Sequence, residues 1–269
     1  MPSFVEKYGP WALVTGASAG IGEEFVRQLA EKGLNVLLVA RRAEKLTDIA
    51  QCVEHDYGVK TRVLGCDVRT ENFLEVIDKA SADLEIGLLV NNAGAASYHG
   101  RFLNRDLETI CQSVHFSIIV QLTLIHHFGN KMAERGKGGI IQVASATGHL
   151  PMPYMVEYSS CKAFQLTMGE GLHYEMKRQG IDVLVLSPGA TKTERVDFGM
   201  EVGPVVSIAL KGLGDKPSII PGIVNKFLVN TRKYLMSRKH RVRTNGAYQE
   251  TNLRRRDREA WGIGKKPAI

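Results

Sequence analysis

Tyr158 and Lys162 lie four residues apart in the stretch EYSSCKAF, which contains no helix breaker. Residues i and i+4 of a helix lie on the same face, with β-carbons about 5 to 6 Å apart, so the phenol and the ammonium can meet. A lysine charge beside a phenol favours the phenolate and lowers the tyrosine pKa from its usual value near about 10. The pair is therefore a candidate for proton transfer, although the same spacing also fits an aromatic residue and a charge on an ordinary helix surface.

A second candidate site is the glycine-rich stretch TGASAGIG, Thr15 to Gly22, which follows an apolar run and precedes an amphipathic one. Gly16, Gly20 and Gly22 permit a tight turn, and they let a pyrophosphate approach backbone amides at the positive end of a helix. The spacing is GxxxGxG rather than the more usual GxGxxG. Its position between the first predicted strand and the first predicted helix favours dinucleotide binding over a mere turn.

The second predicted strand ends at Ala40 and is followed by Arg41 and Arg42. A site for NAD usually carries an acidic residue here, which binds the ribose hydroxyls. Arginine binds phosphate through paired hydrogen bonds, and no carboxylate stands at this position to repel a 2'-phosphate. The sequence therefore predicts NADP(H) as cofactor, unless the two arginines are only solvated.

Short apolar runs alternate with amphipathic stretches over most of the chain. Six apolar runs predict strands, at residues 11–15, 35–40, 61–66, 87–92, 139–145 and 182–187. Helices are predicted at about 20–32, through the mid-fifties, and at about 70–82, 106–135 and 156–179. The strand runs are apolar throughout, as in parallel strands covered on both faces. The sequence therefore predicts an α/β fold with a single doubly wound parallel sheet (Rossmann fold) and helices on both faces.

Residues 190–225 interrupt this alternation with several glycines and prolines. A segment after the last regular strand lies where ligands bind in open sheets, so it is a candidate lid. Its apolar residues, which either face a substrate or pack in the core, are Phe198, Met200, Val202, Val205 and Val206. We assign residues 1–231, with this lid-like segment, to one Rossmann-type domain.

Residues 232–269 form a basic C-terminal tail, with twelve Lys or Arg and three Asp or Glu. The tail has a net charge of +9, so the preceding residues carry about −2 of the chain's +7. Few apolar residues accompany this charge, which predicts a surface-lying or mobile arm. The charge suits nucleic acid, an anionic membrane, an acidic face of a neighbouring subunit, or simply solvent.

The composition, 44% apolar and 23% charged, is that of an ordinary soluble globular protein. No apolar run approaches the roughly 18 residues of a spanning helix, and the first residues lack the layout of a signal peptide. We therefore expect a cytoplasmic protein. The four cysteines form no CxxC pair and the eight histidines show no ligand spacing, so free thiols and no metal site are expected.

Together, these motifs resemble those of the classical short-chain dehydrogenase/reductase family. TGASAGIG, CDV at 66–68, NNAG at 91–94, Ser145 thirteen residues before Tyr158, YSSCK and SPGATKT at 187–193 occur in the family's order and spacing. The resemblance covers roughly residues 10–195. It implies that Tyr158 is the catalytic acid or base, that Lys162 supports its ionisation and contacts the nicotinamide ribose, and that Ser145 hydrogen-bonds the reacting oxygen. It also implies an NADP site formed by Gly16, Ser18, Gly20, Ile21, Gly22, Arg41, Arg42, Asp67, Val68, Asn92, Ala93, Gly94, Tyr158, Lys162, Pro188, Gly189, Thr191 and Thr193.

One position departs from the family. In SVHFSIIVQLT, His115 stands where the family usually carries an asparagine, which is thought to hold a water that links the lysine to solvent. A neutral histidine has both a donor and an acceptor, so His115 either continues this relay as a catalytic residue or, being bulkier, displaces the water. A purely structural histidine is the third interpretation.

We therefore expect an NADP(H)-dependent oxidoreductase that transfers a hydride between nicotinamide and a carbonyl or secondary alcohol of an apolar small molecule. The alternative is a regulatory or scaffold protein that keeps the fold and binds a nucleotide but has lost turnover. Family members often pair two helices across a twofold interface, which implies a homodimer or homotetramer. Gly169 and Gly171, in the helix after Lys162, fit such a close helix contact, or are simply tolerated at these positions.

Overall fold

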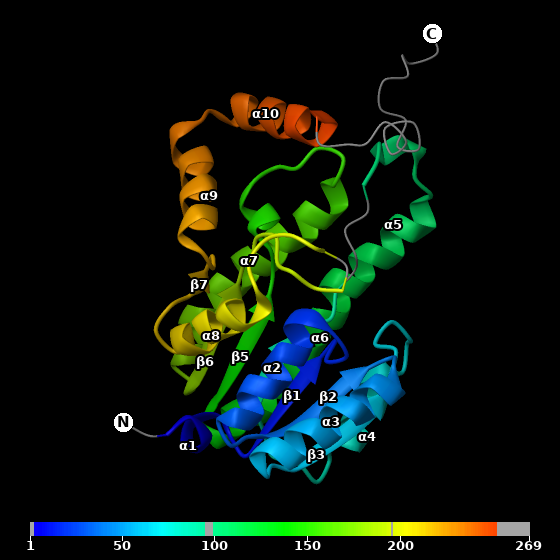
Figure 1. Ribbon diagram of the computed structural model, residues 1–269, viewed down its shortest axis with the longest axis vertical. Coiled ribbons are helices and arrows are strands. Elements are labelled where there is room, and N and C mark those ends of the chain that lie inside the picture. The colour runs from blue at the N-terminus through cyan, green and yellow to red at the C-terminus, as the bar shows by residue number, and fades with distance from the viewer. Residues whose placement is uncertain (1–2, 95–98, 195, 252–269) are drawn as a thin grey trace.

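Seven parallel strands form one sheet in the computed structural model, which describes residues 3–94, 99–194 and 196–251 (Figure 1). The strand order is β3-β2-β1-β4-β5-β6-β7, so the chain reverses its direction of winding between β1 and β4. Ligands bind in such sheets outside the carboxyl ends of the strands, beside this switch point. The strands are β1 (Trp11–Thr15), β2 (Asn35–Ala40), β3 (Thr61–Gly65), β4 (Ile86–Asn91), β5 (Gly138–Val143), β6 (Ile181–Leu186) and β7 (Ser218–Ile219). The predicted Rossmann fold with a single doubly wound sheet is confirmed.

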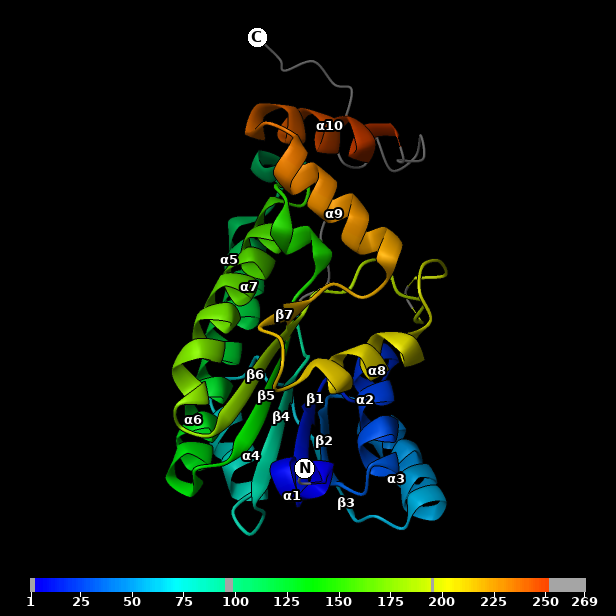
Figure 2. The same ribbon diagram turned by 90° about the vertical axis from the view of Figure 1, so that its left-hand side faces the viewer.

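Helices cover both faces of the sheet, with α2, α3 and α8 on one side and α4, α6 and α7 on the other (Figure 2). The helices are α1 (Phe4–Tyr8), α2 (Gly20–Glu31), α3 (Ala43–Tyr57), α4 (Phe73–Ala80), α5 (Leu107–Val114), α6 (Val120–Arg135), α7 (Val156–Lys177), α8 (Val202–Gly212), α9 (Ile223–Leu235) and α10 (Arg238–Thr251). Two 3-10 turns, Phe102–Asn104 and Ala146–His149, lie in the connections.

Strand β1 shows why the strand runs are apolar throughout. Ala12 and Val14 belong to the core under α2, whereas Leu13 belongs to the core under α6. Successive side chains of a strand point to opposite faces, and here both faces are covered. Burying a large aliphatic side chain stabilises the fold by about 1.5 to 3 kcal/mol relative to leaving it exposed.

The helix predicted at 106–135 is one continuous run in which α5 and α6 are joined by a π-helical turn, His115–Ile119. By length and composition alone, Leu107–Arg135 meets the criterion for a membrane-spanning helix. Within the structure, α6 buries Leu124, Phe128 and Met132 in the core beneath the sheet. The core position therefore accounts for much of its apolar character.

The predicted lid segment 190–225 contains more regular structure than its glycines and prolines suggested. It includes α8 and β7, and the seventh strand was not predicted. Val205 and Val206 are completely buried in the core between α8 and the sheet. Of the two interpretations of these residues, core packing is the one observed, whereas Phe198 is 65% exposed.

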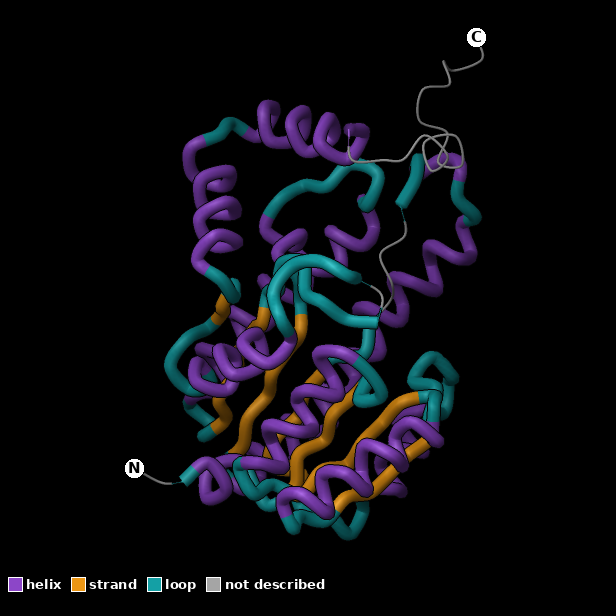
Figure 3. The backbone as a smooth tube through the Cα atoms, viewed as in Figure 1, coloured by secondary structure: helices purple, strands orange, loops and turns teal. Residues whose placement is uncertain are grey.

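The predicted division between residues 231 and 232 falls inside α9, so the chain has no boundary there. Helices α9 and α10 follow one another at the carboxyl end of the sheet (Figure 3). Most of α10 is exposed, but its Asn245 and Gln249 are buried against the body of the protein, so this part of the basic segment is the surface-lying one of the two predicted forms and not a mobile arm. Residues 252–269 lie outside the described residues.

The two glycines in α7 have different surroundings. A β-carbon at Gly169 would lie 2.3 Å from Cγ2 of Val185 in β6, whereas one at Gly171 would meet nothing within 4 Å. Packing of α7 on the sheet of the same chain therefore explains Gly169 without a subunit interface.

Candidate active site

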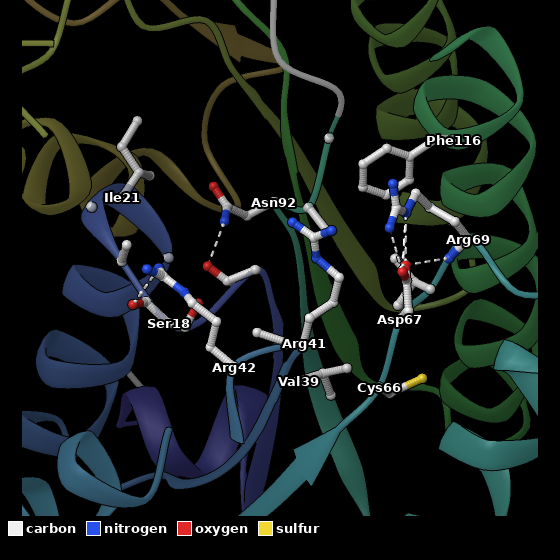
Figure 4. Close-up of a pocket in the computed structure, with 18 of the residues that line it drawn as sticks. Ser18, Ile21, Val39, Arg41, Arg42, Cys66, Asp67, Arg69, Asn92 and Phe116 are labelled. Atoms are coloured by element: carbon white, nitrogen blue, oxygen red, sulfur yellow. Dashed lines mark hydrogen bonds and ion pairs between the residues drawn. The ribbon is translucent and has the colours of Figure 1, made fainter. Parts of the chain in front are cut away.

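A cavity of about 450 Å³ opens at the carboxyl ends of β1, β2, β3 and β4 (Figure 4). Thirteen of the predicted cofactor residues line it: Gly16, Ser18, Gly20, Ile21, Gly22, Arg41, Arg42, Asp67, Val68, Asn92, Ala93, Gly94 and Thr193. The cavity is also lined by residues that the sequence did not single out, among them Arg69, Phe116 and Glu194.

The glycine-rich turn presents backbone amides to this cavity. Helix α2 begins at Gly20, and Ala19, at its N-cap, makes no side-chain capping bond. The first amides of a helix have no intrahelical partner and carry its positive end, so they suit an anion such as a pyrophosphate. A β-carbon at Gly22 would lie 2.1 Å from the carbonyl oxygen of Gly16, so only glycine fits where the turn folds back.

Asn92 fastens this turn to the end of β4. Its side-chain amide donates to the Thr15 carbonyl over 2.9 Å, while its backbone amide donates to the Thr15 hydroxyl over 3.0 Å. The amide of Ala93 donates to the same hydroxyl over 3.0 Å. The NNAG and TGASAGIG motifs therefore form one rigid wall of the cavity.

Arg41 and Arg42 extend into the cavity from the end of β2 (Figure 4). Arg42 donates to the Ser18 hydroxyl over 3.1 to 3.2 Å and to the Ser18 carbonyl over 3.0 Å, and it forms an ion pair with Glu194. Arg41 makes no hydrogen bond within the described residues and lies exposed at the rim. Two guanidinium groups thus stand where the sequence predicted a phosphate-binding pair.

Asp67 lies across the cavity and is engaged by Arg69. The guanidinium of Arg69 donates to its carboxylate over 2.5 and 2.9 Å, and the Arg69 amide donates over 3.1 Å. These hydrogen bonds from Arg69 hold the pKa of Asp67 below its usual range, against a smaller opposing effect of burial. Asp67 is therefore an anionic acceptor at this rim, beside the buried Val68.

Ser145, Tyr158 and Lys162 come together beyond the end of β5. Ser145 caps the 3-10 turn that follows β5, and its hydroxyl accepts from the Thr147 amide over 3.2 Å. Tyr158 and Lys162 both lie on α7, with the ammonium 5.7 Å from the centre of the phenol ring. The side chain of Ser145 is close enough to the phenol to lower its pKa. The predicted catalytic group is therefore assembled from two separate elements.

The expected lowering of the tyrosine pKa by Lys162 is wrong for this arrangement. Burial raises the pKa of the Tyr158 phenol, and the nearby Ser145 side chain offsets this only in part. The lysine is itself buried, and burial lowers its pKa to about 8. Its ammonium donates to the Val143 carbonyl over 2.9 Å and to Oε1 of Gln165 over 3.0 Å, so its charge is directed into the protein.

The residues after β6 lie beside this group. The Ala146 amide donates to the Pro188 carbonyl over 2.8 Å, and the Thr191 hydroxyl donates to the Gly189 carbonyl over 3.1 Å. Pro188, Gly189 and Thr191 do not line the cavity, whereas Thr193 does.

His115 stands apart from the cavity. It begins the π-helical turn, and its carbonyl accepts from the Val120 amide. No hydrogen bond to its side chain occurs within the described residues, and the neighbouring Phe116 lines the cavity in its place. The predicted relay role of His115, which would run through a water, stays a prediction.

Some lining residues could have been found from helical spacing. Thr109, Gln112 and Ser113 line the cavity from α5, at spacings of three and four residues. Gln165 follows Lys162 by three residues on α7, which also places the two on one helix face.

Within the described ranges, no three His, Cys, Asp or Glu residues are placed to hold a metal ion.

Comparison with known proteins agrees with this geometry. A family model for short chain dehydrogenases matches residues 10–199. The chain is 30% identical to a 7beta-hydroxysteroid dehydrogenase of Clostridium sardiniense over 235 residues, which cover 83% of this chain and 90% of that protein. It is 38% identical over 197 residues to a very-long-chain 3-oxoacyl-CoA reductase of Danio rerio. The matched residues cover 71% of this chain and 61% of the reductase, so this chain spans about three fifths of that protein's length. A short-chain dehydrogenase from Sphingobium yanoikuyae, solved in complex with NADPH, superposes with a TM-score of 0.73 at 27% identity and covers 92% of this chain and 97% of its own.

Proposed function

Because this chain belongs to the short-chain dehydrogenase/reductase family, an oxidoreductase family that acts on CH–OH and C=O groups, we propose that it is an NADP(H)-dependent carbonyl reductase or alcohol dehydrogenase. Its substrate would be an apolar small molecule with a ketone or a secondary alcohol. The observation that carries the proposal is the placement of the buried ammonium of Lys162 5.7 Å from the centre of the Tyr158 ring, with the buried Ser145 close to the phenol.

These residues suit the chemistry of a carbonyl group. When a hydride from the nicotinamide reaches a carbonyl carbon, negative charge develops on the oxygen. A hydroxyl such as that of Ser145 stabilises this charge if it is already in position, and a phenol such as that of Tyr158 supplies the proton. The raised pKa of Tyr158 keeps the phenol protonated, as a proton donor in the direction of reduction must be.

The choice of NADP(H) is supported by Arg41 and Arg42 and by the lack of a carboxylate directly after β2. The relative solved with NADPH is consistent with this cofactor. An apolar substrate is supported by the hydroxysteroid dehydrogenase relative, since a steroid is a rigid apolar molecule with secondary hydroxyl groups. A long-chain 3-oxoacyl thioester is a second substrate class, suggested by the reductase relative.

The test is NADPH consumption with a panel of steroid ketones, 3-oxoacyl thioesters and small aldehydes, repeated with NADH. We expect turnover of at least one bulky ketone with NADPH. Tyr158→Phe is the matched control, because it removes one hydroxyl; turnover should fall by about 10²-fold or more, the scale of a lost general acid, while NADPH binding persists. NADPH binding without turnover of any member of the panel would favour the alternative of a nucleotide-binding regulatory protein.

A further inference from the structure

Four side-chain amides are buried together behind Lys162. Asn91, Gln121, Gln142 and Gln165 come from β4, α6, β5 and α7, and each is at most 1% exposed. Burial of an amide is unfavourable unless its donors and acceptors are paired. A cluster of four such groups, each on a different element, therefore requires a mutually consistent set of hydrogen bonds.

Lys162 fixes the direction of the first hydrogen bond. An ammonium can only donate, so Gln165 must turn its carbonyl oxygen toward the lysine, at 3.0 Å. The NH₂ group of Gln165 then points the other way. It donates to the Ser117 carbonyl over 2.6 Å and to Oε1 of Gln121 over 2.7 Å.

The hydrogen bonds continue from Gln165 through Gln121 to the wall of the cofactor cavity. Oε1 of Gln121 accepts from Gln165 and also from the amide of Gln142. Nε2 of Gln121 is therefore directed at the Ala93 carbonyl, at 2.5 Å, and Ala93 lines the cavity. Asn91 completes the cluster by donating to Oε1 of Gln142 over 3.1 Å.

We propose that Gln165 is a positioning residue, which holds the ammonium of Lys162 in place and, through Gln121, ties it to the backbone of Ala93 in the cofactor wall. The inference rests on the proposed function in one respect, the catalytic role of Lys162. In this arrangement the lysine is aligned with the cofactor cavity by side chains of its own core, and the alignment does not require His115.

The hydrogen bond to Gln165 favours the charged form of Lys162. Hydrogen bonds accepted from an ammonium favour its charged form, whereas burial favours the neutral amine. Gln165 therefore opposes the burial that lowers the pKa of Lys162 to about 8. The titratable neighbours on α7 are Cys161 and Tyr158, and the π-helical turn that packs against α7 begins with His115. Strands β4 and β5 contribute only uncharged residues to this region.

Two substitutions should move this pKa in opposite directions. Gln165→Met keeps the volume but removes the acceptor, so the pKa of Lys162 should fall by about one unit or more. Gln165→Glu keeps an acceptor and adds a negative charge, so the pKa of Lys162 should rise. Reduction that needs the ammonium is present below this pKa and lost above it. The falling limb of the pH–kcat profile should therefore move to lower pH in Gln165→Met and to higher pH in Gln165→Glu.

Gln142→Met is the matched control. Gln142 is an equally buried member of the cluster that bonds Gln121 and Asn91 but not Lys162. It should lower the melting temperature as Gln165→Met does, yet keep the falling limb at the wild-type pH. Recovery of the Gln165→Met rate at low pH, which a merely structural defect would not show, is the expected signature.

A direct titration separates this proposal from the proposed function. The ¹³Cε resonance of Lys162 in lysine-labelled protein reports its protonation without any turnover, and Lys162→Met assigns it. Opposite shifts of the titration midpoint in the two Gln165 variants support the proposal, even if no carbonyl substrate is turned over. Midpoints that stay unchanged, or that move in the same direction in both folded variants, overturn it. If Gln165→Glu does not fold, an unshifted midpoint in Gln165→Met alone overturns it.

Discussion

Arg42 and Glu194 form an ion pair, with Nη1 of the arginine 3.2 Å from Oε2 of the glutamate, that joins the end of β2 to the segment after β6. Lys45 of α3 binds the other oxygen of the same carboxylate at 2.6 Å. Glu194 thus forms ion pairs with both Arg42 and Lys45, the cations beside the predicted 2'-phosphate position. A phosphate bound to Arg42 would compete with this carboxylate, which links cofactor binding to the segment that follows Thr193.

Replacing Glu194 by glutamine should therefore favour NADPH. The competing charge is removed while the size of the side chain is kept, and the pairs are partly exposed, so we expect a gain in NADPH affinity of about three- to tenfold. NADH affinity should stay unchanged because NADH has no 2'-phosphate. Calorimetric titration measures both constants. Glu201→Gln is the control, because Glu201 forms a similar exposed pair with Lys192 in the same segment. An equal gain for NADH would contradict competition for the phosphate site.

Arg41→Asp should abolish the preference for NADPH. Charged hydrogen bonds to a phosphate should make wild-type NADPH binding at least about tenfold tighter than NADH binding. The aspartate would repel the 2'-phosphate and accept from ribose hydroxyls, so NADH affinity should be kept or should rise. The ratio of the two dissociation constants is the measurement. Equal affinities for the two cofactors in the wild type would remove the phosphate role of Arg41.

The sequence predicted the parts of the site that local motifs determine. Close contacts such as that of Gly22 with Gly16 require the glycines of the TGASAGIG turn. Helical spacing brings Tyr158 and Lys162 together. These features lie within one or two elements, so their residue types and spacing are visible along the chain.

Contacts between distant elements were not predictable in this way. The pair of Arg42 with Glu194 spans 152 positions, and Gln165 meets Gln121 across 44. The direction of the Tyr158 pKa shift was mispredicted because burial outweighs a nearby charge, and burial depends on the packing around the whole of α7. The basic segment looked like an arm because the partners of its few buried polar residues lie 94 positions away.

His115→Asn tests whether the unusual residue of the long helix takes part in proton transfer. Within the described residues its side chain makes no hydrogen bond, and the cavity is lined by Phe116. We therefore expect turnover to change by much less than the roughly 10²-fold that a lost proton-transfer group costs. The measurement is kcat across the pH range. A large gain would show that the histidine impairs the relay, and a large loss would show that it participates.

Asp182→Asn should lower the stability of the fold and make that stability less dependent on pH. The Asp182 side chain is 3% exposed, and its hydrogen bonds from Lys177, Lys7 and Tyr8 outweigh burial and hold its pKa below the usual range. A carboxyl whose pKa is lowered in the folded state stabilises it above the unfolded pKa, near about 4, and this stability is lost as the pH falls through the folded value. We expect a loss of about 2 to 3 kcal/mol at neutral pH, from hydrogen bonds to a charged group.

Chemical denaturation of wild type and Asp182→Asn at pH 7 and pH 3 measures this effect. The difference in unfolding free energy between the two proteins should shrink at the lower pH. Asp83→Asn is a suitable control, because Asp83 also pairs with a cationic side chain, that of Arg62, but is largely exposed. A difference that is the same at both pH values would show that the charge of Asp182 is not what stabilises the fold.

Deletion from Ser237 onward should leave cofactor binding intact and raise KM for the substrate. Helix α10 does not line the cofactor cavity, but its Asn245 donates to the Pro151 carbonyl over 2.8 Å, and Gln249 contacts the sulfur of Met155 at 3.4 Å. Residues 151–155 lead directly into α7 and Tyr158, and the Tyr154 hydroxyl donates to Glu250 of α10 over 2.5 Å. Without α10 this connection loses the partners that hold it against the body of the protein.

We therefore expect the truncated protein to bind NADPH with nearly wild-type affinity while KM for a ketone substrate rises by about tenfold or more, the effect of losing roughly 1.4 kcal/mol of positioning. Asn245→Ala, which removes the hydrogen bonds of this side chain with Pro151 and Arg232 and leaves the basic charge in place, should reproduce part of the rise. NADPH titration and steady-state kinetics of both proteins decide the matter. Lost NADPH binding in a folded truncated protein would show that the basic segment completes the cofactor site, and an unchanged KM would show that α10 does not position the connection to Tyr158.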